Sequence, residues 1–349
     1  MNIMTSLSNT GYGIVGKNIA LALHRLEESF SIFPFGNQIQ ANSDKEVEIL
    51  RAAAMRSKDD FDVDAICLAV WHQFDLAKRV GRGPYMAYPF FEMDRLSKAD
   101  IKHLQVPDFL VSPSEWAAAI IERDADRECY VINPGVDTEI FYPAKEREES
   151  RPYTFYNIGK WEVRKGHDII PRLFDKAFEV EDDVELVMIC HNPFLTPAQL
   201  AEWHNKYKNM KLASKVKIVG PQPTQHAIAD KMRTYDCGLF PARAEGWNME
   251  ALESMACGNP VIITDYSAHK EYANNETAEL VDIEDTEKAY DGKWFFGQGE
   301  WAELDYEQEE QIIEHMRRMY KERPYNTAGV RKAEELTWEK TAQKFLKIT

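Results

Sequence analysis

The sequence predicts an α/β fold made of two Rossmann-like, doubly wound parallel-sheet domains. Its 349 residues exceed one ordinary domain and suit two domains of about 150–180 residues each. Hydrophobic residues form 44% of the chain, which is enough for two cores. Short apolar runs alternate with amphipathic segments throughout, as is typical of parallel sheets with helices on both faces.

Apolar runs indicate about six strands in each half, the content of one doubly wound sheet. Those of the first half are NIMTSL, SIFPF, AICLAV, PYMAYPF, DFLVS and CYVIN, and those of the second are YTFYNI, VELVMI, KVKIVG, CGLFPA, PVIIT and AELVD. Between the first two runs, Val15, Ile19 and Leu23 recur at helical spacing. The acidic, aromatic-rich segment 284–310 is expected to be an irregular loop packed by its own rings.

A linker is expected at residues 143–152, PAKEREESRP, because this run is charged, flanked by prolines and without apolar periodicity. We therefore predict an N-terminal domain over 1–145 and a C-terminal domain over 150–336. A last helix at about 337–349 is expected to pack back on the N-terminal domain. Such sheets bind ligands beyond the carboxyl ends of their strands, so two facing domains would create a central cleft.

Composition narrows the functional class. The chain carries 58 acidic and 42 basic residues, a net charge of −16, whereas proteins that grip nucleic-acid phosphates are normally basic. No run approaches the ~20 apolar residues of a membrane span, and the N-terminus does not resemble a signal peptide. The five cysteines lie in or beside apolar runs, which is typical of buried thiols in a reducing compartment and predicts a cytoplasmic protein.

Metal binding is not expected. Asp62-Val63-Asp64 matches the D-x-D pattern of cation sites, but it precedes its strand, so a solvated turn is predicted. The nine histidines show no ligand spacing.

The glycine motif Gly11-Tyr12-Gly13-Ile14-Val15-Gly16 matches G-x-G-x-x-G. A dinucleotide site also requires its first glycine at the strand end and an acidic residue about 20 positions later. Here polar residues 8–10 intervene, and the later position, 35–37, has no carboxylate. We predict instead a flexible loop before a helix, whose N–H groups can approach an anion or a sugar. The alternative is a turn that only requires glycines.

Two lysines in the second half flank a short loop at the end of a predicted strand. Gly159-Lys160 ends the strand, and Lys165-Gly166 is expected to open a helix. Both cations could face one anion, and a helix N-terminus would strengthen such a diphosphate site. The alternative is that these lysines are only solvated.

Two carboxylates follow a later strand, within AEGWNMEALESMACGNPVI. A helix is expected to begin near Asn248, which places Glu245 in the preceding loop and Glu253 about a turn inside the helix. Carboxylates accept hydrogen bonds from the vicinal hydroxyls of ribose and hexose. The amides of Asn248, Met249 and Glu250 would point at the ligand.

These segments resemble the family 4 retaining glycosyltransferases of the GT-B fold. The matching elements span most of residues 107–349 and are PSEWAAAII…VINPGVDTEIFYP, G-K-x-x-x-x-K-G at 159–166, VGPQP, the E-x7-E motif from Glu245 to Glu253, and LTWEKTAQKFL. TDYSAHKEY and the run Phe91-Glu92-Met93-Asp94-Arg95 are similar to one subgroup of that family.

The resemblance implies roles on the donor side. Lys160, where the family usually has arginine, would neutralise the leaving diphosphate together with Lys165. Glu253 would hold the ribose of the nucleotide, and Glu245 the hydroxyls of the transferred sugar. Gly13 would lie beneath the diphosphate.

Further positions complete the implied site. Gly11 and Gly246 belong to the donor-binding segments, and the amides of Asn248 and Met249 would contact phosphate or sugar. On the acceptor side Glu92 is favoured, with His72 as the second candidate.

The implied activity is hexosyl transfer from a nucleotide-diphosphate sugar with retention, by front-face attack of an acceptor hydroxyl. Protein cations would stabilise the leaving group, so no metal or other cofactor is expected. The expected acceptor is a polysaccharide or a lipid-linked glycan, with possible peripheral membrane contact. The alternatives are glycosylation of a modified nucleobase in DNA, which the acidic charge disfavours, a sugar-nucleotide epimerase or phosphorylase, and a non-catalytic sugar-binding module.

Overall fold

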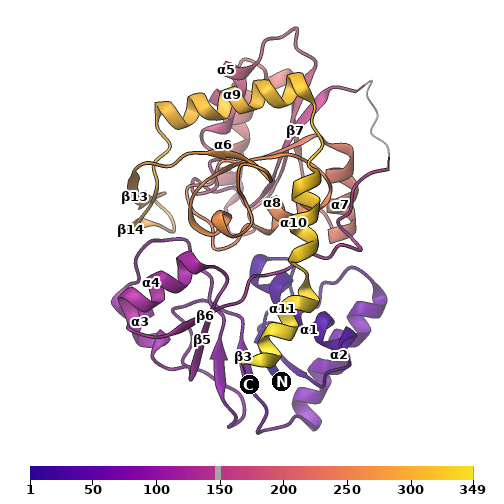
Figure 1. Ribbon diagram of the computed structural model, residues 1–349, viewed down its shortest axis with the longest axis vertical. Coiled ribbons are helices and arrows are strands. Elements are labelled where there is room, and N and C mark those ends of the chain that lie inside the picture. Colours follow the sequence, from indigo (N-terminus) through magenta and orange to yellow (C-terminus); the bar gives the residue numbers. More distant parts are fainter. Residues whose placement is uncertain (146–150, 349) are drawn as a thin grey trace. The chain divides into compact units, whose positions relative to one another are not determined.

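The computed structural model describes residues 1–145 and 151–348. The chain divides into two compact units (Figure 1). The N-terminal unit comprises Met1–Asp137 and Leu336–Thr349, and the C-terminal unit comprises Thr138–Glu335. The predicted linker at 143–152 includes residues 146–150, which lie outside the described residues.

Each unit is built on a six-stranded sheet, and every neighbouring pair in both sheets is parallel. The sheet of the N-terminal unit has the order β2-β1-β3-β4-β5-β6. Its strands are β1 (Asn2–Thr5), β2 (Ser31–Pro34), β3 (Cys67–Ala69), β4 (Tyr85–Ala87), β5 (Phe109–Ser112) and β6 (Cys129–Val131). The predicted pair of parallel-sheet α/β domains is therefore confirmed.

The sheet of the C-terminal unit has the order β12-β11-β10-β7-β8-β9. Its strands are β7 (Tyr153–Gly159), β8 (Val184–Cys190), β9 (Val216–Val219), β10 (Cys237–Phe240), β11 (Val261–Thr264) and β12 (Glu279–Val281). All the apolar runs that the sequence marks as strands contain a strand.

Helices cover both sheets, as their amphipathic patterns predict. In the N-terminal unit they are α1 (Gly11–Arg25), α2 (Asp44–Asp59), α3 (Lys98–Leu104), α4 (Glu115–Ala125) and α11 (Trp338–Lys347). In the C-terminal unit they are α5 (Ile170–Ala177), α6 (Pro197–Lys208), α7 (Gln225–Thr234), α8 (Met249–Ala256), α9 (Tyr306–Glu322) and α10 (Thr327–Glu335). The terminal α11 packs against α1, so both ends of the chain belong to the same unit (Figure 1).

Side-chain caps fix where most of these helices begin. The hydroxyls of Ser43, Ser97 and Ser114 accept hydrogen bonds from the first turns of α2, α3 and α4. Thr196 and Thr224 cap α6 and α7 in the same way. These hydroxyls satisfy N–H groups that the helix itself leaves unbonded, so each helix starts at a defined residue after its strand.

Both sheets contain a switch point, where the chain changes the direction in which it adds strands. In the N-terminal unit the switch point lies between β1 and β3, and in the C-terminal unit it lies between β7 and β10. The loops after these two strands diverge to opposite faces of the sheet, which leaves room for a ligand at their carboxyl ends. In each unit, therefore, the topology favours a ligand-binding site at the switch point.

The segment 284–310 differs from its prediction. It forms an antiparallel hairpin, β13 (Thr286–Tyr290) and β14 (Phe296–Ala302), and α9 begins at Tyr306. The turn begins at Asp291-Gly292, and the Asp291 carboxylate accepts hydrogen bonds from the next three N–H groups. The expected irregular loop is wrong because an Asp-Gly turn and a buried strand face, which includes Trp301, define a hairpin.

Candidate functional site

The switch point of the C-terminal unit brings the loop after β7 against the loop after β10. Gly159 ends β7, and the chain then turns through Gly166, whose φ is +73°. A Cβ on Gly166 would lie 2.2 Å from the carbonyl oxygen of Pro241, which follows β10. Only glycine permits both this left-handed backbone and this close approach. The predicted helix directly after Lys165-Gly166 is wrong, because turns continue until α5 begins at Ile170.

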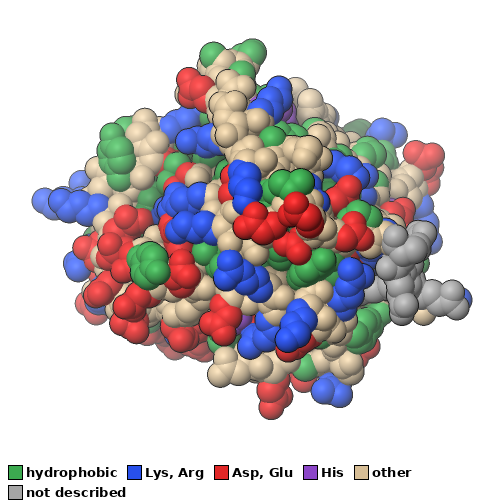
Figure 2. All heavy atoms as spheres, turned by 90° about the horizontal axis from the view of Figure 1, so that it is seen from above, with side chains coloured by type: hydrophobic (Ala, Val, Ile, Leu, Met, Phe, Trp, Pro, Cys, Tyr) green, Lys and Arg blue, Asp and Glu red, His purple; other side chains and the backbone are tan. Residues whose placement is uncertain are grey.

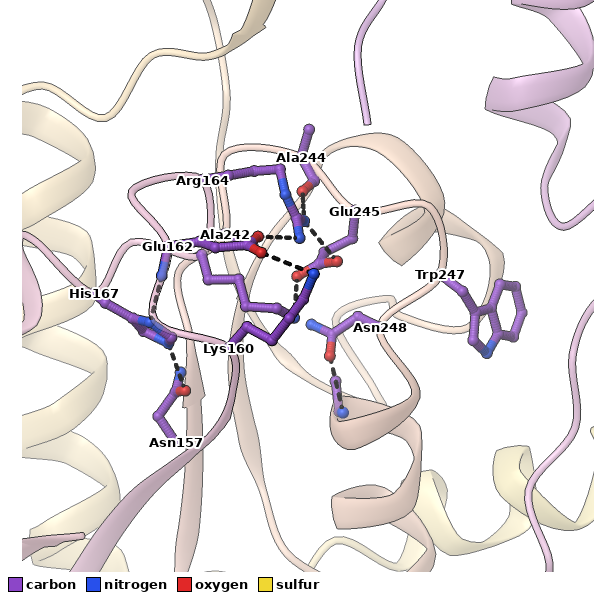
Figure 3. Close-up of polar contacts among 12 residues, drawn as sticks. Asn157, Lys160, Glu162, Arg164, His167, Ala242, Ala244, Glu245, Trp247 and Asn248 are labelled. Atoms are coloured by element: carbon purple, nitrogen blue, oxygen red, sulfur yellow. Dashed lines mark hydrogen bonds and ion pairs between the residues drawn. The ribbon is translucent and has the colours of Figure 1, made fainter. Parts of the chain in front are cut away.

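A chain of ion pairs occupies this position (Figure 3). The Lys165 ammonium lies 2.8 Å from one carboxylate oxygen of Glu245, and the Arg164 guanidinium lies 2.8 Å from the other. Arg164 also pairs with Glu162 at 2.7 Å, and Glu162 pairs with Lys160 at 2.9 Å. We call these five residues the charge cluster. It holds three cations and two carboxylates, so one positive charge remains in excess.

The members of the charge cluster differ in their access to solvent. The Lys160 side chain is 44% exposed, whereas that of Lys165 is 10% exposed and that of Arg164 only 4%. Arg164 also donates a hydrogen bond of 2.6 Å to the carbonyl oxygen of Ala244, which anchors it to the loop after β10. Buried ion pairs of this kind hold their charges in fixed positions. Lys160 is the cation that an incoming anion can reach first.

Electrostatics keep both carboxylates of the charge cluster ionised. Burial raises the pKa of Glu245, but the charges of Arg164 and Lys165 outweigh burial and hold this pKa well below its usual range. The same balance of burial against Arg164 and Lys160 lowers the pKa of Glu162 to about 2. For Lys165, burial is outweighed by Glu245 and Glu250, which raise its pKa. Near neutral pH both carboxylates and the Lys165 ammonium are therefore charged.

The loop between Glu245 and α8 is held in an unusual shape. Asn248 caps α8 in the left-handed region, with φ +70°, and its side-chain oxygen accepts from the Ala251 N–H. Its side-chain amide lies 2.9 Å from Nε2 of His269, whose Nδ1 lies 2.9 Å from the Thr264 carbonyl oxygen. Burial lowers the pKa of His269, which keeps its ring neutral. Met249 and Glu250 then begin α8, where the helix itself leaves N–H groups unbonded.

Trp247 and Gly246 support this loop from the inside. Both are buried, and the Trp247 ring points away from the charge cluster (Figure 3). It packs against Tyr272 with ring centroids 5.2 Å apart. The Tyr272 hydroxyl donates to the carbonyl oxygens of Trp247 and Asn248 at 3.1 and 3.2 Å. The left-handed backbone at Asn248 is thereby stabilised by packing below it.

Glu253 lies in the second turn of α8 and is buried, 7% exposed. Its nearest hydrogen-bond donor is the side-chain amide of Gln225 at 3.4 Å. Burial and the charge of Glu250 raise the pKa of Glu253 to about 8. The charge of Glu250 also raises the pKa of Lys165, so Glu250 influences both Glu253 and the charge cluster. Hydroxyl donors at Glu253 would favour its ionised form.

In the N-terminal unit, Gly11 and Gly13 lie inside α1 and not in a loop before it, so the predicted flexible glycine loop is wrong. A Cβ on Gly13 would lie 2.2 Å from the Ser8 carbonyl oxygen, and one on Gly16 would lie 1.9 Å from the Thr5 hydroxyl. These two glycines let α1 pack closely on the end of β1. A Cβ on Gly11 meets nothing within 4 Å, so this exposed position is open.

The acceptor-side candidates His72 and Glu92 both lie next to Tyr12. His72 follows β3, and its ring centroid is 4.4 Å from that of Tyr12. Burial raises the pKa of the Tyr12 phenol, and the nearby charge of Glu92 raises it further. His72 therefore lies at the switch point between β1 and β3, whereas Glu92 follows the neighbouring strand β4.

Sequence reasoning missed Arg164, Glu162 and His269. Arg164 and Glu162 lie between the two predicted lysines, in the run KWEVRKG, where alternating charges were a possible signal of mutual pairing. The sequence gives no signal for His269, because its contact with Asn248 depends on the folded path of the chain after β11.

The D-x-D segment is exposed and precedes β3, and Asp64 pairs with Arg82 at 2.6 Å. Across residues 1–145 and 151–348, no group of three or more His, Cys, Asp or Glu side chains could hold a metal ion. All five cysteines are buried thiols. Within the same residues, every helix is too short or too polar to cross a membrane.

Part of the chain matches a known protein family. Residues 152–292 match the family model described as glycosyl transferases group 1. This range contains the whole charge cluster, Asn248 and Glu253. The family match therefore lies within the C-terminal unit and includes the candidate donor site.

Curated relatives match part of the chain. D-inositol 3-phosphate glycosyltransferase of Streptosporangium roseum is 28% identical over 175 residues, which cover 45% of this chain and 39% of that protein. The protein of the same name from Corynebacterium glutamicum is 25% identical over 152 residues, which cover 40% of this chain and 36% of that protein. The matched region thus spans less than half the length of these relatives.

Solved structures resemble the whole chain. Sucrose-phosphate synthase from Thermosynechococcus elongatus aligns with a TM-score of 0.72 at 13% identity, over 99% of this chain and 97% of that chain. Anabaena HepE in complex with UDP and glucose aligns with a TM-score of 0.72 at 14% identity, over 100% and 99%. This likeness shows that the chain has the GT-B type of fold.

Proposed function

We propose that this protein transfers a sugar from a nucleotide-diphosphate sugar to an acceptor hydroxyl with retention of configuration. The observation that carries the proposal is the charge cluster at the β7/β10 switch point. It places a partly exposed lysine beside a buried lysine and a buried arginine. A cationic, preorganised position of this kind suits a departing diphosphate.

In the proposed step, the bond between the anomeric carbon and the phosphate oxygen breaks. The acceptor oxygen bonds to the same face of that carbon, and its proton passes to the departing phosphate oxygen. Lys160 and Lys165 stabilise the charge that develops on the diphosphate, while Arg164 holds Glu245 in place. These cations take the role that a divalent metal has in other transferases, so we propose a metal-independent reaction.

The two carboxylates have separate roles in this proposal. Glu245 stays ionised, so it accepts hydrogen bonds from hydroxyls of the transferred sugar. Glu253 accepts from the ribose hydroxyls, and the N–H groups of Met249 and Glu250 approach phosphate or sugar. The assignment of the family 4 E-x7-E roles to these two residues is supported by their position around the N-terminus of α8.

The donor and the acceptor are proposed from similarity and charge. HepE was solved with UDP and glucose, so UDP-hexoses are the first donors to test. The relatives are named for an inositol phosphate acceptor, whereas we propose a polysaccharide or lipid-linked glycan, reached in the cytoplasm and with peripheral membrane contact. Transfer to DNA is disfavoured by the net charge of −16. On the face seen in Figure 2, basic side chains alternate with acidic ones and form no continuous basic stripe.

The test combines thermal stabilisation with product analysis. We expect one nucleoside diphosphate and its sugar conjugate to raise the melting temperature, and that conjugate to be hydrolysed or transferred without added metal. The anomeric configuration of the product, read by NMR, should equal that of the donor. Isomerisation of the donor without release of nucleotide would identify an epimerase and reject the proposal, as would inversion at the anomeric carbon.

A further inference from the structure

Aromatic rings follow four neighbouring strands of the N-terminal sheet. Phe35 comes after β2, Tyr12 after β1, Trp71 after β3 and Phe90 after β4. These strands are adjacent, in the order β2-β1-β3-β4, and all run parallel, so their carboxyl ends share one edge of the sheet. We call these four residues the ring row.

The ring row is continuous. The centroids of Phe35 and Trp71 are 4.4 Å apart, those of Trp71 and Tyr12 are 5.5 Å apart, and those of Tyr12 and Phe90 are 5.7 Å apart. The Tyr12 hydroxyl donates a hydrogen bond of 2.7 Å to the Phe90 carbonyl oxygen, which fixes the middle of the row. The ring contacts run in the order Phe35, Trp71, Tyr12, Phe90, so the four rings form one continuous aromatic surface.

The rings are only partly covered by the protein. All four members of the ring row are half-buried, and Phe74, which stacks on His72 at 4.8 Å, is 51% exposed. A cluster of rings at a sheet edge would normally be buried by neighbouring elements, because each ring carries a large apolar surface. The partial exposure at a topological switch point leaves ring faces and edges available to a ligand.

Polar groups accompany the rings in a pattern that suits hydroxyls. His72 packs against Tyr12 in the middle of the ring row, and Glu92 follows Phe90 near enough for its charge to raise the pKa of the Tyr12 phenol. The amine of the nearby Lys17 is buried and bonds to the side-chain oxygen of Asn9 at 2.7 Å and to the Gln40 carbonyl oxygen. A carboxylate beside rings repels phosphates, while it accepts hydrogen bonds from neutral sugars.

We propose that the ring row, with Phe74, binds a neutral glycan as the acceptor. This proposal rests on the transferase function proposed above and names its acceptor class. The C–H groups on one face of a pyranose are apolar and slightly positive, so they pack against the negative face of an aromatic ring. The hydroxyls at the rim of the sugar bond to Glu92 and His72.

The experiment is saturation-transfer difference NMR on the full chain. The probes are maltose, cellobiose and lactose as neutral glycans, myo-inositol 1-phosphate as a phosphorylated polyol, and thymidine as a carrier of a nucleobase. We expect a neutral disaccharide to receive saturation mainly on the C–H protons of one ring face. Saturation of only the phosphate or nucleobase probe, or of no neutral sugar, would overturn the proposal.

Variants locate the binding. Phe74→Ala removes an exposed ring and Trp71→Ala removes the centre of the row, and we expect each to weaken disaccharide binding at least ten-fold. The matched control is Phe296→Ala, because Phe296 is 63% exposed on the hairpin of the other unit. Phe74→Ala keeps the test decisive if Trp71→Ala lowers the melting temperature. Unchanged affinity in Phe74→Ala and in a folded Trp71→Ala would reject the ring row as the site.

Donor hydrolysis on the same samples separates this inference from the proposed function. Hydrolysis of a nucleotide sugar, without neutral sugars contacting the rings, would keep the function and reject this inference. Sugar binding that depends on the rings, without donor binding or hydrolysis, would keep a sugar site at the ring row and reject the transferase function.

Discussion

The two units of this chain use the same position of related sheets for opposite chemistry. The sheet of the C-terminal unit, counted along the chain, has the order 3-2-1-4-5-6, and that of the N-terminal unit has the order 2-1-3-4-5-6. In both, the site lies where the strand order changes direction. The C-terminal switch point holds the charge cluster, with two carboxylates and three cations, whereas the N-terminal switch point holds the ring row.

The charged side chains and the aromatic side chains suit different ligands. Buried ion pairs hold their charges rigidly and suit a phosphate, whose negative charge grows as a bond breaks. Half-buried rings suit the apolar faces of sugars and contribute little to the binding of anions. Topology therefore places the two sites, and the side chains after the strands decide what each accepts. Variants of the charge cluster should change donor binding, and variants of the ring row should change acceptor binding.

The largest effect is expected at Arg164, which links Glu162 and Glu245. Arg164→Ala leaves two buried carboxylates short of a cation, and breaking buried pairs in this way costs about 3–5 kcal/mol of unfolding free energy. Urea unfolding followed by circular dichroism measures the loss. Arg164→Lys should retain part of the stability. A loss below about 1 kcal/mol would show that the pairs of the charge cluster contribute as little as solvent-exposed ones.

A pH effect is expected at Glu253. Its pKa in the folded protein is about 8, above its ordinary value of 4.5. The folded state then holds a proton that the unfolded state releases, so this group lowers stability as pH rises from about 4.5 to about 8. Glu253→Gln should remove this loss and be more stable than the parent at pH 8, by on the order of 3–5 kcal/mol. At pH 4.5 the two proteins should be equally stable.

The measurement for Glu253 is urea unfolding of both proteins at the two pH values. The same variant should weaken nucleotide binding, because a neutral amide is a poorer acceptor for ribose hydroxyls. A stability difference that does not change with pH would contradict the raised pKa.

At the charge cluster, Lys165→Ala should weaken nucleoside diphosphate binding by about 10–100-fold, the range of one to two charged hydrogen bonds. Glu245→Gln should mainly lower kcat, because it weakens contacts to the transferred sugar. Calorimetry gives the affinities, and initial rates give kcat. Lys208→Ala, at an exposed lysine in α6, is the matched control and should behave as the parent does. Equal affinity of Lys165→Ala and Lys208→Ala for the nucleoside diphosphate would contradict our assignment of the diphosphate to the charge cluster.

The smallest effects are expected from the glycines of α1. Gly13→Ala should cost about 1–3 kcal/mol of stability, because its Cβ would collide with the Ser8 carbonyl oxygen. Gly11→Ala has open space around its Cβ and should leave stability within about 0.5 kcal/mol. Thermal unfolding of the pair measures both. If Gly11 lies beside the donor as predicted, Gly11→Ala should weaken donor binding although the stability of the protein is unchanged.

The strands could be predicted from the sequence because parallel strands buried on both faces form continuous apolar runs. The lysines and carboxylates of the donor side were also predictable, because they directly follow such runs. The hairpin at 286–302 was missed because its strands contain several polar residues and only its Asp-Gly turn is a strong local signal. The start of α1 at Gly11 was missed because three glycines with low helix propensity fall in its first two turns, where packing on the end of β1 requires Gly13 and Gly16.

The pairings within the sites could not be predicted. Arg164 meets Glu245 because β7 and β10 are neighbours, although these residues lie 81 positions apart in the chain. The ring row exists only because β2, β1, β3 and β4 are adjacent, and strand order is not encoded in any local pattern. Aromatic residues after strands are common, so each ring alone carries no functional signal.

The most direct measurement is a crystal structure of the full chain soaked with the nucleotide sugar that stabilises it most. The account predicts diphosphate oxygens within about 3.2 Å of the amines of Lys160 and Lys165, and ribose hydroxyls on the Glu253 carboxylate. A donor seated on the aromatic edge of the N-terminal sheet, with the five charged residues of the other unit untouched, would contradict it.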